Sequence, residues 1–224
     1  MKRNAIRSLV VMMIAVMVFA LTPVPVSAAS KAPARAKITS VKVAAVSTST
    51  NKTTVTIKWK KAKRATGYIV WVKHGTGQWV KQIKLGKRYR KLKLMNVPAG
   101  QFDVKVQAVN KRKLGKETVV KSKYIVSPMT LTDYANRVEP SMKYGGSDVK
   151  ISFAGNTVTY TYDLSGKISS IDDAKAAINA KASDLKNAAT NIINAARLDA
   201  GISGVTVIYN YVYNGTTLQS FTFR

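Results

Sequence analysis

The alternation of apolar and polar residues between residues 36 and 127 constrains this fold more than any other feature of the sequence. In the segment 55–59, Val, Ile and Trp at every second position alternate with Thr and Lys. The same period returns in the segments 68–73 and 102–108. A period of two places the apolar side chains on one face of a strand, and turns containing Gly or Pro separate the strands. About seven such short strands predict an all-β sandwich.

Three motifs in this segment carry a family resemblance. They are Trp59, the segment 65–70 (Ala-Thr-Gly-Tyr-Ile-Val) and the segment 102–110 (Phe-Asp-Val-Lys-Val-Gln-Ala-Val-Asn). In all three, residues 36–127 resemble a fibronectin type III domain, whose second strand carries a core tryptophan and whose sixth strand reads Tyr-x-Val-x-Val-x-Ala-x-Asn. Phe102 replaces the usual tyrosine, so the hydroxyl of the family's tyrosine corner is missing. The resemblance implies an immunoglobulin-like sandwich and an extracellular module, but no particular ligand.

A step in charge near Pro128 divides the chain. Residues 31–128 contain 25 Lys and Arg against 2 acidic residues, whereas residues 129–224 contain 9 against 8. Lysine becomes rarer after the step, and Ala, Asn and Asp become more common. Such asymmetry is typical of two units with different partners. We therefore expect a β-sandwich domain over residues 36–127 and a second, smaller domain over residues 129–224.

The second segment mixes strands with a helix. Alternating runs predict one hairpin around Gly155 and another around the strong turn pair Asn214-Gly215. Between the hairpins, Ser170 begins a helix with a capping-box-like pattern, apolar residues recur at three- and four-residue spacing, and Gly201 ends the helix. A short helix over 131–138 precedes them. The order β-β-α-β-β predicts an α+β domain, with a four-stranded antiparallel sheet and one long helix across a face.

Three short motifs in this second segment carry another resemblance. They read Val-Thr-Tyr-Thr-Tyr over 158–162, Val-Thr-Val-Ile-Tyr over 205–209 and Asn-Gly-Thr-Thr-Leu over 214–218. The segment is similar to an uncharacterised domain family found in secreted proteins and lipoproteins of Gram-positive bacteria. The resemblance implies a compartment and an architecture, but no activity.

The N-terminus has the organisation of a signal peptide. Three basic residues precede an apolar run over Leu9–Leu21, and small residues then offer cleavage after Ala28 or Ala29. The run is short for a helix that spans a bilayer, which needs about 20 residues. We expect residues 1–29 to be removed and the protein to be secreted, with possible association to the cell envelope. An uncleaved membrane anchor is the alternative.

The sequence offers little for catalysis. It contains no Cys and one His, which removes thiol nucleophiles, thiolate metal sites and most triads. His74 stands beside a glycine and is interpreted as an exposed loop residue. Asp172 and Asp173 are neighbours on a helix, so they cannot face each other as a carboxylate pair. The tyrosines at 160, 162, 209, 211 and 213 are interpreted as sheet packing. We therefore expect no enzyme, no cofactor and no metal.

The basic residues of the sandwich are concentrated in three loops. In a fibronectin type III topology, the loops after the second, fourth and sixth strands meet at one end of the module, here with the basic N-terminal segment beside them. We call this end the polybasic pole. Its twelve candidate residues are Lys60, Lys61, Lys63, Arg64, Lys87, Arg88, Arg90, Lys91, Lys111, Arg112, Lys113 and Lys116. Folding does not require such a concentration of like charge, which costs self-repulsion.

A polyanion is the partner that this charge pattern favours. For an exported bacterial protein, the candidates are an anionic cell-wall polymer, a membrane surface or an acidic glycan. Extracellular nucleic acid is a further candidate, because Trp71, Trp79 and Tyr89 lie among the lysines and could stack on bases. Trp71 and Lys73 are expected to face outward, so the sheet could extend the site. The alternatives are a spacer or accessory module without a polyanion ligand, and charge that serves only solubility.

Overall fold

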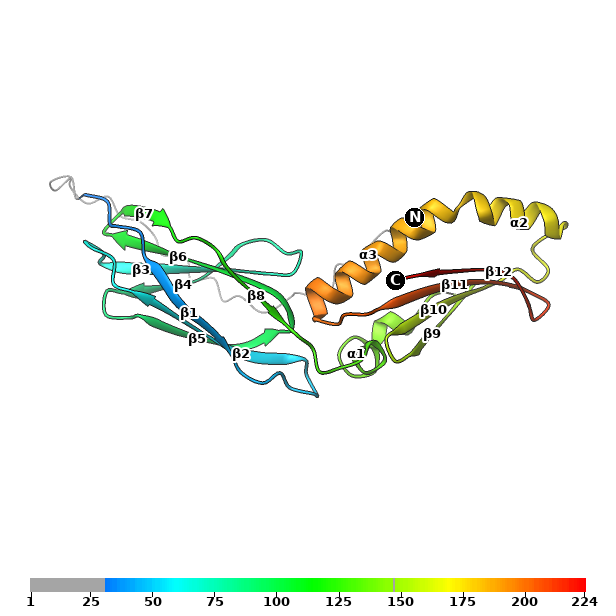
Figure 1. Cartoon of the computed structure of the whole chain (residues 1–224), viewed down its shortest axis with the longest axis horizontal. Helices are drawn as coiled ribbons and strands as arrows, with labels where there is room; N and C mark the ends of the chain where they lie inside the picture. The colour runs from blue at the N-terminus through cyan, green and yellow to red at the C-terminus, as the bar shows by residue number, and fades with distance from the viewer. Residues whose placement is uncertain (1–30, 147) are drawn as a thin grey trace.

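The computed structural model describes residues 31–146 and 148–224, so the expected signal peptide lies outside the described residues. Eight strands come first (Figure 1). They are β1 Lys37–Val43, β2 Lys52–Lys60, β3 Gly67–His74, β4 Val80–Gly86, β5 Lys91–Pro98, β6 Gly100–Asn110, β7 Lys113–Glu117 and β8 Lys121–Ile125. The later elements are α1 Leu131–Arg137, the 3-10 helix Pro140–Lys143, β9 Val149–Ala154, β10 Thr157–Asp163, α2 Ile171–Ala180, α3 Ala182–Ala200, β11 Thr206–Tyr213 and β12 Thr216–Phe223.

The first eight strands form two facing sheets. One sheet has the order β1-β2-β5, and the other has the order β4-β3-β6-β7, with β8 also paired to β6. All the pairings in both sheets are antiparallel. The expected seventh strand is therefore two shorter strands, β7 and β8, which both pair with β6. This is the β-sandwich that the alternation predicted, with the fibronectin type III-like strand order that the resemblance implied.

The sandwich core is built from the inward positions of the alternating runs. Val55, Ile57 and Trp59 of β2 are buried, whereas Lys58 between them is exposed. The rings of Trp59 and Tyr68 lie 5.7 Å apart in a tilted arrangement. Aromatic pairs of this kind add to the burial of their apolar area. The alternation in the sequence therefore identified the side of each strand that faces the core.

The sheet of the C-terminal segment has the order β12-β11-β10-β9. It is mixed, so the prediction of an antiparallel sheet was wrong. The two hairpins β9–β10 and β11–β12 are antiparallel as expected. Their inner strands β10 and β11, however, lie side by side and run parallel. The helical segment between them is a crossover connection, which returns the chain to the same end of the sheet. The element order was correct, but hairpin signals do not specify how two hairpins meet.

The predicted single helix is two helices, which is a second correction. Lys181 lies between α2 and α3 with φ −91° and ψ 1°, outside helical geometry. α2 contacts β12, whereas α3 contacts β11 and β12 and continues to β6 of the sandwich. The break allows α2 and α3 to take different directions, so both can stay in contact with a twisted sheet. One straight helix would diverge from such a sheet. The ends match expectation: the Ser170 hydroxyl caps the start and Gly201 ends α3 with φ 71°.

The end of α3 is held by side chains and backbone of the sandwich. The Asn51 amide nitrogen donates to the Ala200 carbonyl at 2.8 Å, and the Ser127 hydroxyl donates to the Asn51 amide oxygen at 2.7 Å. The Ser127 backbone N–H donates to the Gly201 carbonyl at 2.9 Å. The last carbonyls of a helix lack partners within the helix, and here the sandwich supplies them. Asn51 is only 2% exposed, so this junction is an ordered part of the fold.

Two glycines of the sandwich allow this close approach. Gly75 lies against the side chain of Asp199, and the Thr76 N–H next to it donates to that carboxylate at 2.9 Å. Gly100 has φ +121°, and a Cβ there would collide with the carbonyl oxygen of Leu198. Only glycine combines this backbone conformation with this contact. The junction lies at the end of the sandwich where α3 arrives (Figure 1).

Candidate anion-binding surface

The loops of the polybasic pole and the N-terminal segment are joined by hydrogen bonds. The backbone N–H of Trp59 donates to the Arg90 carbonyl at 3.0 Å, which ties the end of β2 to the loop before β5. The Thr66 N–H donates to the Val109 carbonyl at 2.7 Å, which ties the loop before β3 to the end of β6. The structure therefore brings together three loops that are far apart in the sequence, at the end opposite the junction with α3.

The N-terminal segment lies against the same loops. The Ala34 N–H donates to the Lys63 carbonyl at 2.9 Å, and Arg64 Nε donates to the Ala32 carbonyl at 3.1 Å. The Asn110 amide nitrogen donates to the Lys31 carbonyl at 2.9 Å. These bonds occupy the Arg64 Nε and place further basic residues of the N-terminal segment beside the pole.

Local backbone geometry turns the pole residues toward solvent. Arg64 has φ 64° and Lys111 has φ 52°, so each sits at the tight point of its loop. The buried Tyr68 hydroxyl accepts the Ala62 N–H at 3.0 Å and fixes the loop after β2 from below. The Lys111 N–H donates to the Thr66 hydroxyl at 3.0 Å. The loops are thus held mainly by core and backbone contacts, to which the side chains of Arg64 and Arg90 add.

Arg90 differs from the other eleven candidates. It is half-buried, whereas the rest are exposed. Its guanidinium lies 4.8 Å from the centre of the Tyr68 ring, and its Nη1 donates to the Tyr89 carbonyl at 2.6 Å. A guanidinium over an aromatic face is attracted by the ring quadrupole. Arg90 therefore has a packing role, which sequence reasoning did not foresee.

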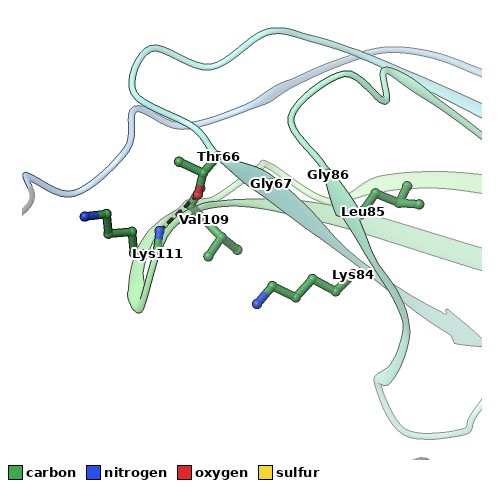
Figure 2. A pocket seen from close by; sticks show the side chains of 7 residues that line it. All are labelled: Thr66, Gly67, Lys84, Leu85, Gly86, Val109 and Lys111. Carbon is green, nitrogen blue, oxygen red and sulfur yellow. Dashed lines mark hydrogen bonds between the residues drawn. The ribbon is translucent and has the colours of Figure 1, made fainter. Parts of the chain in front are cut away.

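A surface depression beside the pole adds one lysine that the sequence reasoning missed. Thr66, Gly67, Lys84, Leu85, Gly86, Val109 and Lys111 line it (Figure 2). Lys84 comes from β4 and Lys111 from the turn between β6 and β7, so two ammonium groups flank backbone from three loops. Lys84 faces outward opposite Ile69 in the strand register. That register could have been read only from the paired strands.

The outer face of the larger sheet does not offer free stacking surfaces. Lys105 Nζ lies 5.7 Å from the Trp71 ring centre and 4.6 Å from the Trp79 ring centre. The same ammonium forms an ion pair with Glu117 at 2.8 Å. Both indoles are half-buried and contact a cation of the protein itself. Of the three aromatic residues considered for base stacking, only Tyr89 is largely exposed, at 57%.

Lys73 also has a partner within the protein. Its ammonium lies 3.5 Å from the carboxylate of Asp103, which also accepts from the Gln101 amide at 2.8 Å. Burial by itself raises the pKa of Asp103, but hydrogen bonds from Ser122 and Gln101 and the charge of Lys73 outweigh it and lower the pKa. The carboxylate therefore stays ionised and holds Lys73. The expectation that Trp71 and Lys73 extend the anion site is not favoured by these contacts.

His74 is not the exposed loop residue that was predicted. It is the last residue of β3, it is half-buried, and its Nε2 lies 2.9 Å from the Ala99 carbonyl oxygen. Pairing with β6 continues to His74, opposite Phe102, which extends the strand beyond the apolar run. In the part of the chain that the structure describes, no three His, Asp or Glu side chains gather as a metal site would require.

The tyrosines of the C-terminal sheet β12-β11-β10-β9 pack beneath the helices. Tyr160 stacks on Tyr209 with centroids 5.3 Å apart, and Tyr162 stacks on Tyr211 at 5.0 Å. Tyr209 is buried within a cluster that includes residues of α1, α3 and all four strands of the sheet. These pairs come from the parallel strands β10 and β11, in register. Tyr213 is half-buried at the end of β11.

Alkaline pH is expected to weaken this second core. Burial, and then the neighbouring tyrosines Tyr160, Tyr162 and Tyr211, raise the pKa of Tyr209 to about 12. The raised value means that the folded state prefers the neutral phenol, so its contribution to stability is complete below about pH 10 and is lost as the pH rises toward 12. Chemical denaturation of the Tyr209→Phe variant should show a smaller loss of unfolding free energy over this range than the wild type. Parallel profiles would contradict the assignment.

Comparisons with known proteins cover both halves of the chain. A family described as "Domain of unknown function (DUF4854)" matches residues 123–223, from β8 to the end of β12. No curated protein matches the chain. Within residues 31–146 and 148–224, no helix is long and apolar enough to cross a membrane.

Solved structures that resemble part of the chain are fibronectin type III and titin domains. A mutant of the domain FN3tt has 14% identity and a TM-score of 0.33, over 42% of this chain and 97% of the other. The FN3 domain of human collagen XX has 16% identity and a TM-score of 0.32, over 45% and 98%. The titin kinase with its flanking domains has 21% identity and a TM-score of 0.34, over 43% and 18%. The assignment of the sandwich rests on the order and register of its own strands.

Proposed function

We propose that this chain is an exported, non-enzymatic bacterial protein whose sandwich binds anionic polymers of the cell envelope or the extracellular space through the polybasic pole. The observation that carries the proposal is the convergence of loops 60–64, 87–91 and 110–116, which contribute twelve Lys and Arg and no acid. Eleven of these side chains are exposed. Because the loops are held mainly by backbone and core contacts, their exposed charges can meet a ligand, although Arg64 also bonds to the N-terminal segment.

The proposal includes two domains with different roles. The first, residues 36–127, has its own core of Val, Ile, Trp and Tyr side chains. The second, residues 129–224, has a separate core under α1 and α3. The junction with α3 lies at the opposite end of the sandwich from the pole, so the second domain does not cover the pole. Residues 1–29 act as a signal peptide in this proposal, and the second domain has a partner of its own.

A spacer or accessory role is the second candidate. The bonds from Asn51 and Ser127 to the end of α3 support it, because they fix one unit on the other and hold their ends apart. In that case the positive charge serves solubility, and the protein has no polyanion ligand. The two functions differ in one measurable respect, which is whether affinity for a polyanion depends on where the charges lie.

Neutralising the pole is expected to weaken binding without unfolding the protein. In the mature chain, four exposed pole residues are changed to Gln: Lys61, Lys63, Lys87 and Arg88. Affinity for poly(glycerol phosphate) should fall markedly at low salt and the wild-type affinity should itself fall steeply as salt rises, because exposed charges are screened over about 8 Å at physiological salt. Unfolding free energy should change by under about 0.5 kcal/mol for each solvated substitution. Isothermal titration and chemical denaturation measure the two quantities.

The control removes the same charge from the second domain. Lys143, Lys150, Lys175 and Lys186 are exposed and are changed to Gln in the matched variant. Equal losses of affinity in the two variants would mean that the charge acts diffusely. Absence of wild-type binding to the polymer and to anionic vesicles at low salt would reject the polyanion function and leave the spacer.

A further inference from the structure

The outer face of the sheet β1-β2-β5 carries seven exposed lysines. Inward positions of β2 are buried apolar residues, so the alternate positions point outward, and the strand register extends this face to β1 and β5. We call this surface the lysine face. Its members are Lys37, Lys42, Lys52, Lys58, Lys60, Lys91 and Lys93. Lys60 and Lys91 also belong to the polybasic pole, so the two surfaces are continuous.

The register places like charges directly opposite each other on this face. Lys58 pairs with Lys91 across β2 and β5, and Lys37 pairs with Lys60 across β1 and β2. Like charges at directly opposite positions destabilise a sheet. A polar uncharged residue at any of these positions would support the fold better. The arrangement therefore costs stability that no contact within the sheet offsets.

The acidic residues of the sandwich lie on the other sheet. Asp103 and Glu117 are the only acids between residues 31 and 128, and they pair with Lys73 and Lys105. The sequence of β1, β2 and β5 contains no acid. Asp103 and Glu117 each offset one lysine of the larger sheet, which also carries exposed lysines such as Lys81 and Lys123, whereas the strands β1, β2 and β5 contain no acid at all. This difference between the two faces points to a ligand path along the lysine face.

The chemistry of the face favours a linear polymer without bases. The residues between the lysines include Ser40, Thr54 and Thr56, and the one large apolar side chain that is exposed on this face is Met95. No aromatic ring lies on the outward positions, so nothing here can stack on a base. All seven cations are lysines, which act as mobile point charges and do not impose the planar geometry of arginine.

We infer that the lysine face continues the polybasic pole as the binding track for an extended phosphodiester polymer without nucleobases, such as poly(glycerol phosphate). This inference rests on the proposed function and names its ligand class and path. The backbones of adjacent strands lie about 4.8 Å apart, and alternate residues along a strand are about 6.8 Å apart, so the lysines stem from a regular lattice. A flexible polyanion can follow this lattice from the pole along β2 and β5 (Figure 1).

The test uses a variant that leaves the polybasic pole unchanged. Lys42, Lys58 and Lys93 are changed to Gln in the mature protein, and Lys150, Lys175 and Lys186 are changed to Gln in the matched control. Affinity for long poly(glycerol phosphate) at low salt should fall roughly 100-fold in the first variant, from roughly fivefold per lysine near a polyanionic surface. The slope of log affinity against log salt should fall in magnitude by about two, since each contact with a single-stranded polyanion releases about 0.7 counterion.

Stability provides an independent readout for the same variant. Removing Lys58 relieves its repulsion with Lys91, so the thermal midpoint should stay the same or rise at low salt. The inference would be overturned if the thermal midpoint of this variant fell and its loss of polymer binding matched the fraction of protein that is unfolded. The control variant should keep the affinity of the wild type.

The outcomes separate this inference from the proposed function. If the pole variant loses affinity and the lysine-face variant binds like the control, the track is wrong and the pole remains. If the wild type binds no polymer, the proposed function fails. Tighter binding to single-stranded DNA of equal charge would overturn the assignment of a polymer without bases. Tighter binding to phosphatidylglycerol vesicles would replace the polymer by a membrane surface.

Discussion

Replacing Trp59 by Ala should destabilise the sandwich by about 3–5 kcal/mol, the range for deletion of a large buried aromatic side chain. Trp59 is 3% exposed, lies in the main core cluster and packs on Tyr68. Its indole N–H has no hydrogen-bond partner among the described residues, so the substitution removes packing and leaves no broken hydrogen bond behind. Chemical denaturation of residues 30–224, with a signal that reports the unfolding of the sandwich, measures the loss.

Trp79→Ala is the matched control for this prediction. Trp79 is half-buried on the outer face, where its ring contacts the Lys105 ammonium at 4.6 Å. A cation–π contact contributes from about 0.5 kcal/mol when exposed to about 2 kcal/mol when desolvated, so the loss should be smaller than at Trp59. Equal losses at the two tryptophans would mean that the strand register described above is wrong.

Replacing Gly100 by Ala should loosen the junction between the two units. The backbone conformation at φ +121° costs an L-residue about 1–3 kcal/mol. The added Cβ also collides with the backbone of Leu198, and overpacking of this kind costs typically about 1–3 kcal/mol more. Gly155→Ala is the control, because Gly155 also has a positive φ but nothing lies near its Cβ position. The difference between the two variants in the intact protein reports the collision together with the greater backbone strain at φ +121° than at φ +56°.

The separate domains test the same junction from the other side. Residues 30–128 and 129–224, expressed apart, should each unfold in one cooperative transition, because each has its own core. In the first fragment Leu198 is absent, so Gly100→Ala should cost only its backbone part. If either fragment stays unfolded while the intact protein folds, the two units are not autonomous domains. If Gly100→Ala costs the same in both forms, the contact with α3 contributes nothing to stability.

The candidate site was only partly predictable from the sequence. The list of basic loop residues follows from composition, and their convergence follows once a sandwich topology is assumed. The packing role of Arg90 does not follow, because it depends on the ring of Tyr68, more than twenty residues earlier in the chain. The outward position of Lys84 and the ion pairs of Lys73 and Lys105 depend on strand register, which sequence periodicity leaves open.

The sequence by itself determined much of the local structure of this protein. Alternation identified the strands, the Ser170 hydroxyl began α2, Gly201 ended α3, and Asn214-Gly215 formed a turn with positive φ at both residues. Each of these features depends on neighbours within a few residues, where steric limits and short-range hydrogen bonds act. Only the tertiary structure decided that β10 and β11 run parallel and that lysines pair across β2 and β5. It alone brought Asn51 to the carbonyl of Ala200, because such contacts depend on how whole elements pack after the chain has folded.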